Sequence, residues 1–427
     1  MPPSPAQAGA PRFEFFASTA PGLESIAAGE LRTLGVRGRQ EIGGVAFSGD
    51  LDRLYAANLW LRTVSRVVVR LGRFHAGTFY ELERRAKKLS WDEFLPANGR
   101  VRLRVTCRKS KLYHSDAVGE RIMSAITSST SRAIELSGEG NDDGDSDDAE
   151  VAEKAEENET QKSRSRNESR GSQLFVVRIL HDEVEVSADS SGELLHRRGY
   201  RQEIAKAPLR ETLAAAMVLA SGWKKHEPLV DPMCGSGTIP IEAALIARDV
   251  APGLRRKFQF MTWPAFDAGV WSMILEEATG RVTNTTPQIR GSDRDGGAVQ
   301  ASLRNAERAA VADAIEFSAA SLSGSLASLE DVEAGAGWVL TNPPYGIRMG
   351  ESDDLRDLYA RVGTALRIKK GWRIGILTAD AGLVRKTQLP LVPRFSTRNG
   401  GIPVGFLVSD KPRKEFDHSY NRGVEKR

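Results

Sequence analysis

Two cysteines, Cys107 and Cys234, are all that the 427-residue chain contains. At most one disulfide can form, and neither cysteine has a partner at a spacing that binds zinc. The longest apolar run covers the eight residues from Leu213 to Ala220, whereas a bilayer-spanning helix needs about 20. The N-terminus lacks the basic cluster and apolar stretch of a secretory signal. We therefore predict no metal site, no membrane span and a cytoplasmic location.

The charges are unevenly distributed. Net charge is only +4, but residues 139–160 hold eleven acids and one base, which leaves +14 on the rest of the chain. Between Arg62 and Arg121, 15 Lys or Arg stand against 6 acids. This balance suits a phosphate backbone, although charge alone does not separate a nucleic-acid interface from an ordinary solvated surface. The length predicts two to three domains at about 150 residues each, and a hydrophobic share of 40% is enough for more than one core.

Short strands and helices alternate through the first half. Their order over residues 1–74 predicts a ferredoxin-like α+β subdomain, and residues 75–197 form a second unit. Strands are expected at 13–18, 43–49, 65–74, 101–107, 174–180 and 184–189, and helices at 21–35, 51–61, 81–89 and from 115 to about 136. Residues 138–172 are polar and nearly free of large apolar side chains. Because they bury too little surface to offset the entropy of ordering, we expect a disordered acidic insertion.

From residue 198 to 412 strands alternate with longer helices. This pattern predicts an α/β domain with a doubly wound parallel sheet. It ends in an antiparallel hairpin that turns at Asn399 and Gly400, the layout of class I (Rossmann-like) methyltransferases. Residues 413–427 are expected to be a flexible basic tail. No second catalytic unit follows before Arg427, so we do not expect a fused two-enzyme form.

A glycine loop, Asp231 to Thr238, lies between a predicted strand and helix, where doubly wound folds bind ligands. It lacks the lysine of a phosphate loop. It also has Pro240 where a dinucleotide fingerprint needs its third glycine. S-adenosylmethionine fits better, with Asp293 at the next strand end to accept hydrogen bonds from the ribose hydroxyls. A plain glycine turn and a helix-capping Asp293 are the simpler alternatives. Candidate cofactor contacts in this loop are Asp231, Pro232, Cys234, Gly235, Ser236, Gly237 and Thr238.

A second motif follows another buried strand and reads Asn342, Pro343, Pro344, Tyr345. An exocyclic amine on a nucleobase is a poor nucleophile because its lone pair is delocalised into the ring. The Asn342 side-chain carbonyl and the Pro343 backbone carbonyl could hold its two hydrogens out of plane, and the prolines make the turn rigid. Tyr345 offers a ring for stacking. These four residues are the predicted catalytic group.

At these residues the sequence resembles a known family, the THUMP-domain methyltransferases that modify the 2-amino group of guanine in large-subunit ribosomal RNA. The similarity extends to 195–201, 207–215, 231–253 and 341–351, and to Ser110–Ser115 in the N-terminal half. It implies a ferredoxin-like subdomain, a THUMP domain for RNA and a catalytic domain that uses S-adenosylmethionine. Pro208 to Thr212 would border the cofactor pocket. No acid follows the strand at 315–319 to hold the adenine amine, which departs from the pattern.

The predicted partner is RNA, above all 23S-type ribosomal RNA or a pre-ribosomal particle. Transfer RNA guanine methylation, DNA adenine methylation and a noncatalytic ribosome assembly factor are the alternatives. His114 and His196 are expected to be structural or RNA-facing, and Trp263, Trp271 and Trp338 to be core, although Trp263 could line the base pocket. Candidate RNA contacts in the basic region are Arg102, Arg104, Arg108, Lys109, Lys111, Tyr113 and His114.

Overall fold

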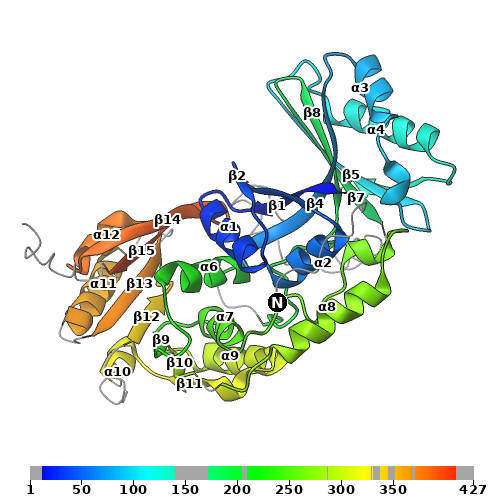
Figure 1. The fold of residues 1–427 in the computed structure, drawn as a ribbon. Helices are drawn as coiled ribbons and strands as arrows, with labels where there is room; N and C mark the ends of the chain where they lie inside the picture. Colours follow the sequence, from blue (N-terminus) through cyan, green and yellow to red (C-terminus); the bar gives the residue numbers. More distant parts are fainter. Residues whose placement is uncertain are drawn as a thin grey trace, which may run out of the picture.

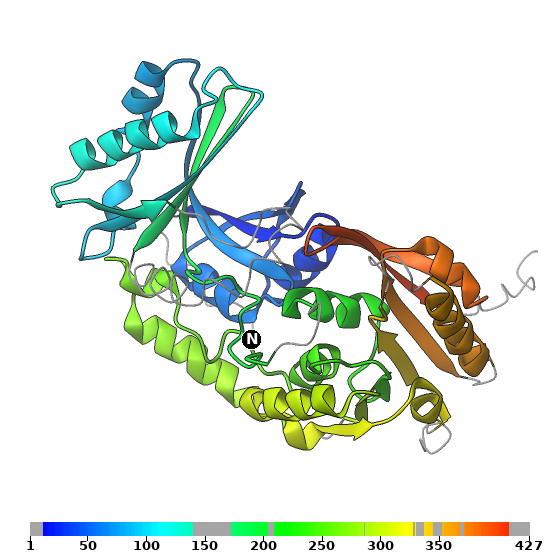
Figure 2. The same ribbon diagram turned by 180° about the vertical axis from the view of Figure 1, so that it is seen from behind.

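The computed structural model describes residues 12–139, 172–203, 209–285, 287–327, 329, 337–344, 352–367 and 371–409. Its strands form two sheets (Figure 1), one of eight strands and one of seven. The eight-stranded sheet contains only residues from the first half of the sequence, and the seven-stranded sheet only residues from the second. Figure 2 shows the same arrangement from behind.

The eight-stranded sheet has the order β2-β3-β1-β4-β8-β7-β5-β6. The long strand β4 (Val64–His75) pairs with β1 (Phe13–Thr19) on one side and β8 (Glu183–Asp189) on the other, so both predicted N-terminal units share one sheet. The other strands are β2 (Arg39–Glu41), β3 (Gly44–Gly49), β5 (Arg100–Arg108), β6 (Glu135–Glu139) and β7 (Gln173–Leu180). The helices are α1 (Glu24–Thr33), α2 (Leu51–Trp60), α3 (Phe79–Ala86) and α4 (Ser115–Ser129), with a 3-10 turn η1 (Trp91–Glu93).

Alternation along the strands decides which side chains meet the helices. Phe15 and Ala17 of β1 and Val67 and Val69 of β4 lie in one apolar core with residues of α1, α2 and α4. The residues between them, Phe16 and Val68, point to the opposite face because successive side chains in a strand alternate, and they form a separate small cluster with Ala46.

Two features of the first half differ from the sequence prediction. The helix expected to reach about residue 136 ends at Ser129, and Glu135 begins β6, which pairs in parallel with β5. Periodicity could not reveal this strand because its pairing partner is distant in sequence. The predicted bounds of the acidic insertion, residues 138–172, are too wide at both ends, since β6 extends to Glu139 and Ser172 is buried. Residues 140–171 lie outside the described residues.

The seven-stranded sheet has the order β11-β10-β9-β12-β13-β15-β14, parallel except for its terminal hairpin. This confirms the predicted class I methyltransferase fold. The strands are β9 (Leu229–Asp231), β10 (Ile289–Asp293), β11 (Ile315–Ala319), β12 (Gly337–Thr341), β13 (Trp372–Thr378), β14 (Leu391–Asn399) and β15 (Ile402–Ser409). The helices are α6 (Glu211–Ser221), α7 (Thr238–Ala247), α8 (Ala268–Gly280), α9 (Gly296–Ala309), α10 (Leu322–Ala327), α11 (Ser352–Arg367) and α12 (Ala381–Lys386), with 3-10 turns η3 (Gln259–Thr262) and η4 (Ala312–Ala314).

Helices cover both faces of this sheet. Leu229 of β9 lies in a core with residues of α6, α7 and α9, whereas its neighbour Val230 lies in a second core with residues of α10, α11 and α12. A strand that is buried on both sides must be apolar at every position, which is why these strands read as continuous hydrophobic runs.

The terminal hairpin turns one residue later than predicted. Asn399 still pairs with Ile402, and the loop consists of Gly400 and Gly401, with φ of 56° and 83°. Two consecutive positive φ angles are required in a type I′ turn, and two glycines adopt them with less strain than an Asn-Gly pair.

The segment between α7 and β10 packs against the N-terminal half. The ring of Phe260 stacks on Tyr55 of α2 with centroids 4.5 Å apart, and Trp271 lies in the same core. Trp263 donates from Nε1 to Gln173 Oε1 of β7 at 2.7 Å. Trp263, Trp271 and Trp338 are all buried, which confirms the core assignment, and Trp263 lies in the core of the N-terminal half.

Candidate active site

The two predicted loops leave adjacent strands of the sheet. β9 and β12 pair in parallel, with Val230 opposite Val339, and they end at Asp231 and Thr341. On its other side β9 pairs with β10, which ends at Asp293. Because carboxyl ends of parallel strands meet at one edge, the glycine loop, Asp293 and Asn342 lie along the same edge. This is the juxtaposition that the sequence predicts.

Asp293 holds the glycine loop in place. Its Oδ2 accepts a hydrogen bond from the Gly235 backbone N–H at 3.0 Å, and its Oδ1 accepts one from the Asp295 N–H at 3.0 Å. The Cys234 N–H donates to the Ser292 carbonyl at 2.9 Å. The loop after β9 is therefore tied to the end of β10, and each Asp293 oxygen keeps a lone pair for a ligand hydroxyl.

Both loop glycines have positive φ, 53° at Gly235 and 81° at Gly237. A Cβ on Gly237 would come within 2.9 Å of Ser302 Cβ and 3.2 Å of the Phe317 ring. Gly237 is thus needed for its backbone angle and for packing against α9.

Two residues of α9 support the same loop and were missed by the sequence prediction. Ser302 Oγ donates to the Gly235 carbonyl at 2.8 Å, and Asn305 Nδ2 donates to the Ser236 carbonyl at 3.1 Å. Both side chains are fully buried. Their three-residue spacing on the apolar side of a helix was a signal, since buried polar groups need partners.

Asp231 is fully buried, and this burial raises the pKa of its carboxyl to about 7. The Met233 N–H, which donates to Oδ1 at 3.2 Å, lowers the pKa, and the negative charge of Asp293 raises it. A nearby positive charge would favour the ionised form. The carboxyl is therefore well placed to sense a cationic ligand.

The other predicted cofactor contacts differ in what they offer. Burial and the Asp231 charge raise the pKa of the Cys234 thiol, which lies 3.8 Å from Ser302 Oγ and packs in the loop. Pro232, Ser236 and Thr238 are buried in the loop and the start of α7, and Thr212 is buried in the first turn of α6. Pro208 lies outside the described residues.

Asn342 directly follows β12 and is one of several described residues with a buried side-chain atom that lacks a hydrogen-bond partner, as are Trp338 and Thr341 of that strand. Its side-chain oxygen Oδ1 is buried and has no hydrogen-bond partner among the described residues. A buried acceptor without a donor costs about 1–3 kcal/mol, so native structures rarely keep one without a reason. Pro343 is buried and Pro344 exposed, while Tyr345 lies outside the described residues.

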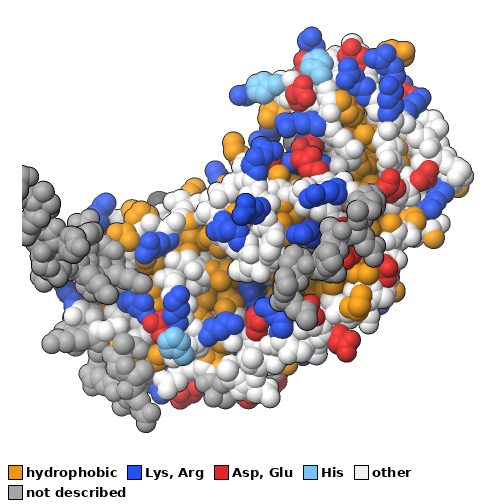
Figure 3. All heavy atoms as spheres, in the orientation of Figure 1, with side chains coloured by type: hydrophobic (Ala, Val, Ile, Leu, Met, Phe, Trp, Pro, Cys, Tyr) orange, Lys and Arg blue, Asp and Glu red, His pale blue; other side chains and the backbone are white. Residues whose placement is uncertain are grey.

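The predicted RNA contacts lie on and after β5, far from these loops (Figure 1). Arg102 donates from Nε to Ser172 Oγ at 2.9 Å, and Arg104 also has an interaction partner. Tyr113 is 68% exposed, with its ring centroid 4.0 Å from that of His114. Arg108, Lys109 and Lys111 are exposed as well. Lys and Arg side chains recur from the centre to the upper right of Figure 3, toward this end of the molecule.

His196 belongs neither to the two loops at the strand edge nor to the predicted RNA contacts. It is largely buried, and burial together with the neighbouring Arg210 and Arg197 lowers the pKa of its imidazole to about 3. Within the described ranges, no cluster of three His, Cys, Asp or Glu could hold a metal ion. None of the helices described is long and apolar enough to cross a membrane.

Two family models match the sequence. Residues 198–403 match the RMKL-like methyltransferase domain, and residues 14–68 match the RlmL ferredoxin-like domain. The first contains both loops of the site, and the second covers β1 to the start of β4.

Two curated relatives resemble nearly the whole chain. A putative RNA methyltransferase of Synechocystis sp. is 32% identical over 92% of this chain and 95% of its own length. The ribosomal RNA large subunit methyltransferase K/L of Syntrophotalea carbinolica is 34% identical over 94% of this chain. The chain spans only 54% of that K/L protein.

Two solved structures share the fold over 94% of this chain. The putative methyltransferase SMU.472, complexed with SAH, is 29% identical with a TM-score of 0.77 and is covered over 99% of its length. A predicted N6-adenine-specific DNA methylase from Listeria monocytogenes is 31% identical with a TM-score of 0.78 and is covered over 97%.

Proposed function

This chain belongs to the RMKL-like methyltransferase family, and on that premise we propose that it methylates the 2-amino group of a guanine in large-subunit ribosomal RNA. The methyl donor in this proposal is S-adenosylmethionine. The 23S-type RNA is its substrate, free or in a pre-ribosomal particle, and residues 75–197 are the THUMP domain that binds it.

The unpartnered Oδ1 of Asn342 carries the proposal. A buried carbonyl oxygen at the carboxyl end of a central strand is matched by an N–H donor on a ligand, and an exocyclic amine has two. The amine hydrogen held by Asn342 would leave the nitrogen lone pair directed out of the ring plane. Tyr345, three residues on, is proposed to stack on the base.

The glycine loop fits S-adenosylmethionine. Asp293 has free lone pairs for ribose hydroxyls, and the buried Asp231 carboxyl is ionised more readily beside a positive charge. The solved structure complexed with SAH, the demethylated form of this donor, has the same fold. When bound, the donor supplies an electrophilic methyl group on a sulfonium.

Positioning is the main task of this chain's own residues. Asn342 and the Pro343 carbonyl hold and orient the amine, and the two prolines keep the turn from relaxing. Asp231 and Asp293 fix the neighbouring loop, so the two reactants meet at one strand edge. The proton leaves to solvent after transfer, because the methylated amine is acidic enough to need no dedicated base.

Methylation of a 6-amino group on adenine in DNA is the second candidate, because Asn342 would hold that amine in the same way and a similar structure is described as an N6-adenine-specific DNA methylase. The relatives described as RNA methyltransferases favour RNA, as does the basic N-terminal half. Transfer RNA is the alternative substrate among RNAs.

One assay separates these substrates. The purified chain is incubated with isotopically labelled S-adenosylmethionine and, in parallel, protein-free large-subunit ribosomal RNA, transfer RNA and duplex DNA. We expect label in ribosomal RNA, recovered by mass spectrometry as 2-methylguanosine. Label only in transfer RNA or in DNA adenine would replace the proposed substrate, and no affinity for S-adenosylmethionine by calorimetry would refute the proposed reaction.

A further inference from the structure

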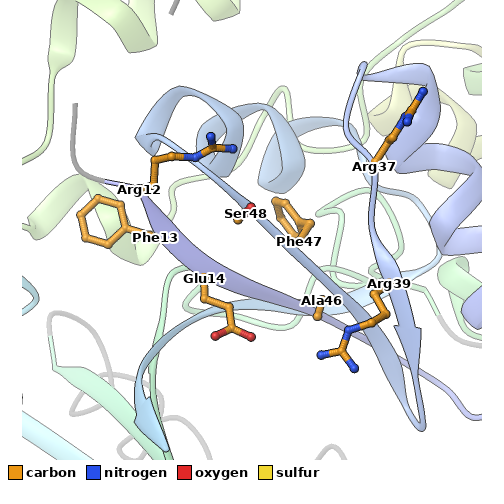
Figure 4. A pocket seen from close by; sticks show the side chains of 8 residues that line it. All are labelled: Arg12, Phe13, Glu14, Arg37, Arg39, Ala46, Phe47 and Ser48. Carbon is orange, nitrogen blue, oxygen red and sulfur yellow. The ribbon is translucent and has the colours of Figure 1, made fainter. Parts of the chain in front are cut away.

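A pocket of about 480 Å³ lies in the N-terminal sheet, among residues that none of the predicted sites includes. Figure 4 shows Arg12 and Phe13 on one side of it, Arg37 and Arg39 on the other, and Phe47 and Ser48 between them. The residues come from β1, β2, β3 and the chain segments directly before β1 and before β2. The full lining is Arg12, Phe13, Glu14, Arg37, Arg39, Ala46, Phe47 and Ser48.

The charges around this pocket do not cancel. Glu14, its only acid, accepts a hydrogen bond from Arg70 Nη1 at 2.9 Å, and Arg39 pairs with Glu41 at 2.6 Å. Arg12 and Arg37 are exposed and form no ion pair with another described residue. Two guanidinium groups that pair with no described carboxylate therefore lie at a pocket whose lining also includes Phe13 and Phe47.

Such a pocket suits a phosphate that carries a nucleoside. A guanidinium offers a planar fork of donors that matches two phosphate oxygens, and it is weakly hydrated compared with an ammonium. The half-buried ring of Phe13 and the Ser48 hydroxyl add an apolar surface and a hydrogen-bonding group at the same place. An anion without an organic part would leave the aromatic wall unused.

Strand register places Glu14 and Ser48 of this pocket on the sheet face that carries the predicted RNA contact Arg104, whereas Phe13 and Phe47 pack toward the core on the other face. Residues directly paired across a sheet point to the same side. The row that leads from the pocket to β5 is Ser48, Glu14, Arg70, Ser187, Val176, Arg104. Five strand spacings of about 4.8 Å separate its ends by roughly 24 Å. The two arginine groups thus lie toward opposite edges of one face.

We propose that the Arg12–Arg37 pocket binds a backbone phosphate of the RNA substrate, as a second anchor on the sheet face that carries Arg104. This proposal rests on the proposed function, since it takes RNA as the substrate. The anchor acts at the ferredoxin-like end of the sheet, and it touches neither the cofactor nor the reacting base.

The test compares the full-length chain with the double variant Arg12→Ala/Arg37→Ala. The probe is a labelled large-subunit ribosomal RNA transcript, and binding is measured from 50 to 300 mM salt. We expect about tenfold weaker binding, with the slope of log affinity against log salt smaller by about 0.7 to 0.9, because one lost phosphate contact contributes that amount. Arg32→Ala, an exposed arginine of α1 outside the pocket, is the matched control and should bind like the parent.

Further measurements keep the outcomes distinct. Calorimetry with S-adenosylmethionine should give the same affinity for all these proteins, which shows that the variants fold. RNA binding by the double variant equal to that of the parent would overturn the pocket and leave the proposed function intact. Uridine monophosphate should compete only at concentrations far above those of the RNA, and competition at equal concentrations would assign the pocket to a free nucleotide instead. Failure of the parent itself to bind RNA would overturn both proposals.

Discussion

The loops after β9 and β12 leave neighbouring strands but satisfy their polar groups in different ways. In the glycine loop, the N–H groups of Met233 and Gly235 find partners in the side chains of Asp231 and Asp293, and α9 contributes Ser302. In the Asn342 loop, the side-chain oxygen stays buried without a donor among the described residues. The first loop is completed by the protein, whereas the second has an acceptor that none of the described residues satisfies.

This difference indicates separate roles. A loop whose hydrogen bonds are complete keeps its shape without ligand, so its substitutions should change folding and cofactor affinity together. A loop with an unpaired acceptor loses little stability when that acceptor is removed, so its substitutions should affect the reaction alone. Four substitutions test the contrast.

Asn342→Ala should have the largest effect. We expect methyl transfer to fall by a factor of about 100 to 1,000, because an oriented hydrogen-bonding group in a water-excluded site contributes on that scale. Affinity for RNA and for S-adenosylmethionine should change by less than about 1 kcal/mol, as measured by titration and calorimetry. Asn342→Asp, which keeps an acceptor oxygen, should retain more activity. Equal losses of binding and of transfer would contradict the assigned role.

Asp293→Ala should act on the other loop. Two backbone N–H groups lose their acceptor, and we expect S-adenosylmethionine affinity to fall by roughly 10- to 100-fold with a loss of about 1–3 kcal/mol in the free energy of unfolding. Asp295→Ala is the matched control, since it removes only the N-cap of α9 and should cost about 1 kcal/mol with cofactor affinity preserved. If both variants bound the cofactor like the parent, Asp293 would have no part in the site.

Asp231→Asn tests the buried carboxyl through pH. The folded-state pKa of about 7 lies above the ordinary aspartate value of 3.8, so the folded protein keeps a proton that the unfolded chain releases as pH rises between these values. Ionisation of this carboxyl therefore reduces the stability of the unliganded protein progressively up to about pH 7. The variant should be more stable than the parent by a few kcal/mol at pH 8 and by much less at pH 5, measured by urea unfolding. The exposed Asp92→Asn is the control, and a gain independent of pH would refute the explanation.

Gly237→Ala should have the smallest effect. The new Cβ meets Ser302 at 2.9 Å in a backbone with φ of 81°, and we expect a loss of about 1–3 kcal/mol in unfolding free energy. Gly280→Ala at the end of α8 meets nothing within 4 Å and should leave stability almost unchanged. Equal stability of the two variants would show that the glycine loop tolerates a side chain.

Much of the catalytic half could be predicted from sequence because its signals are local. Continuous apolar runs, the glycine loop after β9 and the proline pair after β12 each fix a local structure, and parallel strands bring their carboxyl ends to one edge. The bond between Asp293 and Gly235 joins residues 58 positions apart, and only the folded structure shows it.

The N-terminal half was less predictable because strand order decides its architecture. No local pattern shows that β4 joins β1 to β8, or that β6 replaces the end of a helix. The pocket of Arg12 and Arg37 was missed for the same reason, since its lining comes from three strands and the chain segments before β1 and before β2. The alternation of apolar and polar residues predicts which side chains share a sheet face, but it does not predict which strands are neighbours.

The aromatic residues between α7 and β10 have a consequence for how the molecule melts. Phe260 and Trp271 come from the catalytic half of the sequence, yet they complete the core under α2 with Tyr55. The core of the N-terminal half is therefore incomplete without these residues of the catalytic half. We expect both sheets to unfold in a single cooperative step on heating. Cleavage of the chain before Tyr200 should expose apolar aromatic side chains on each fragment.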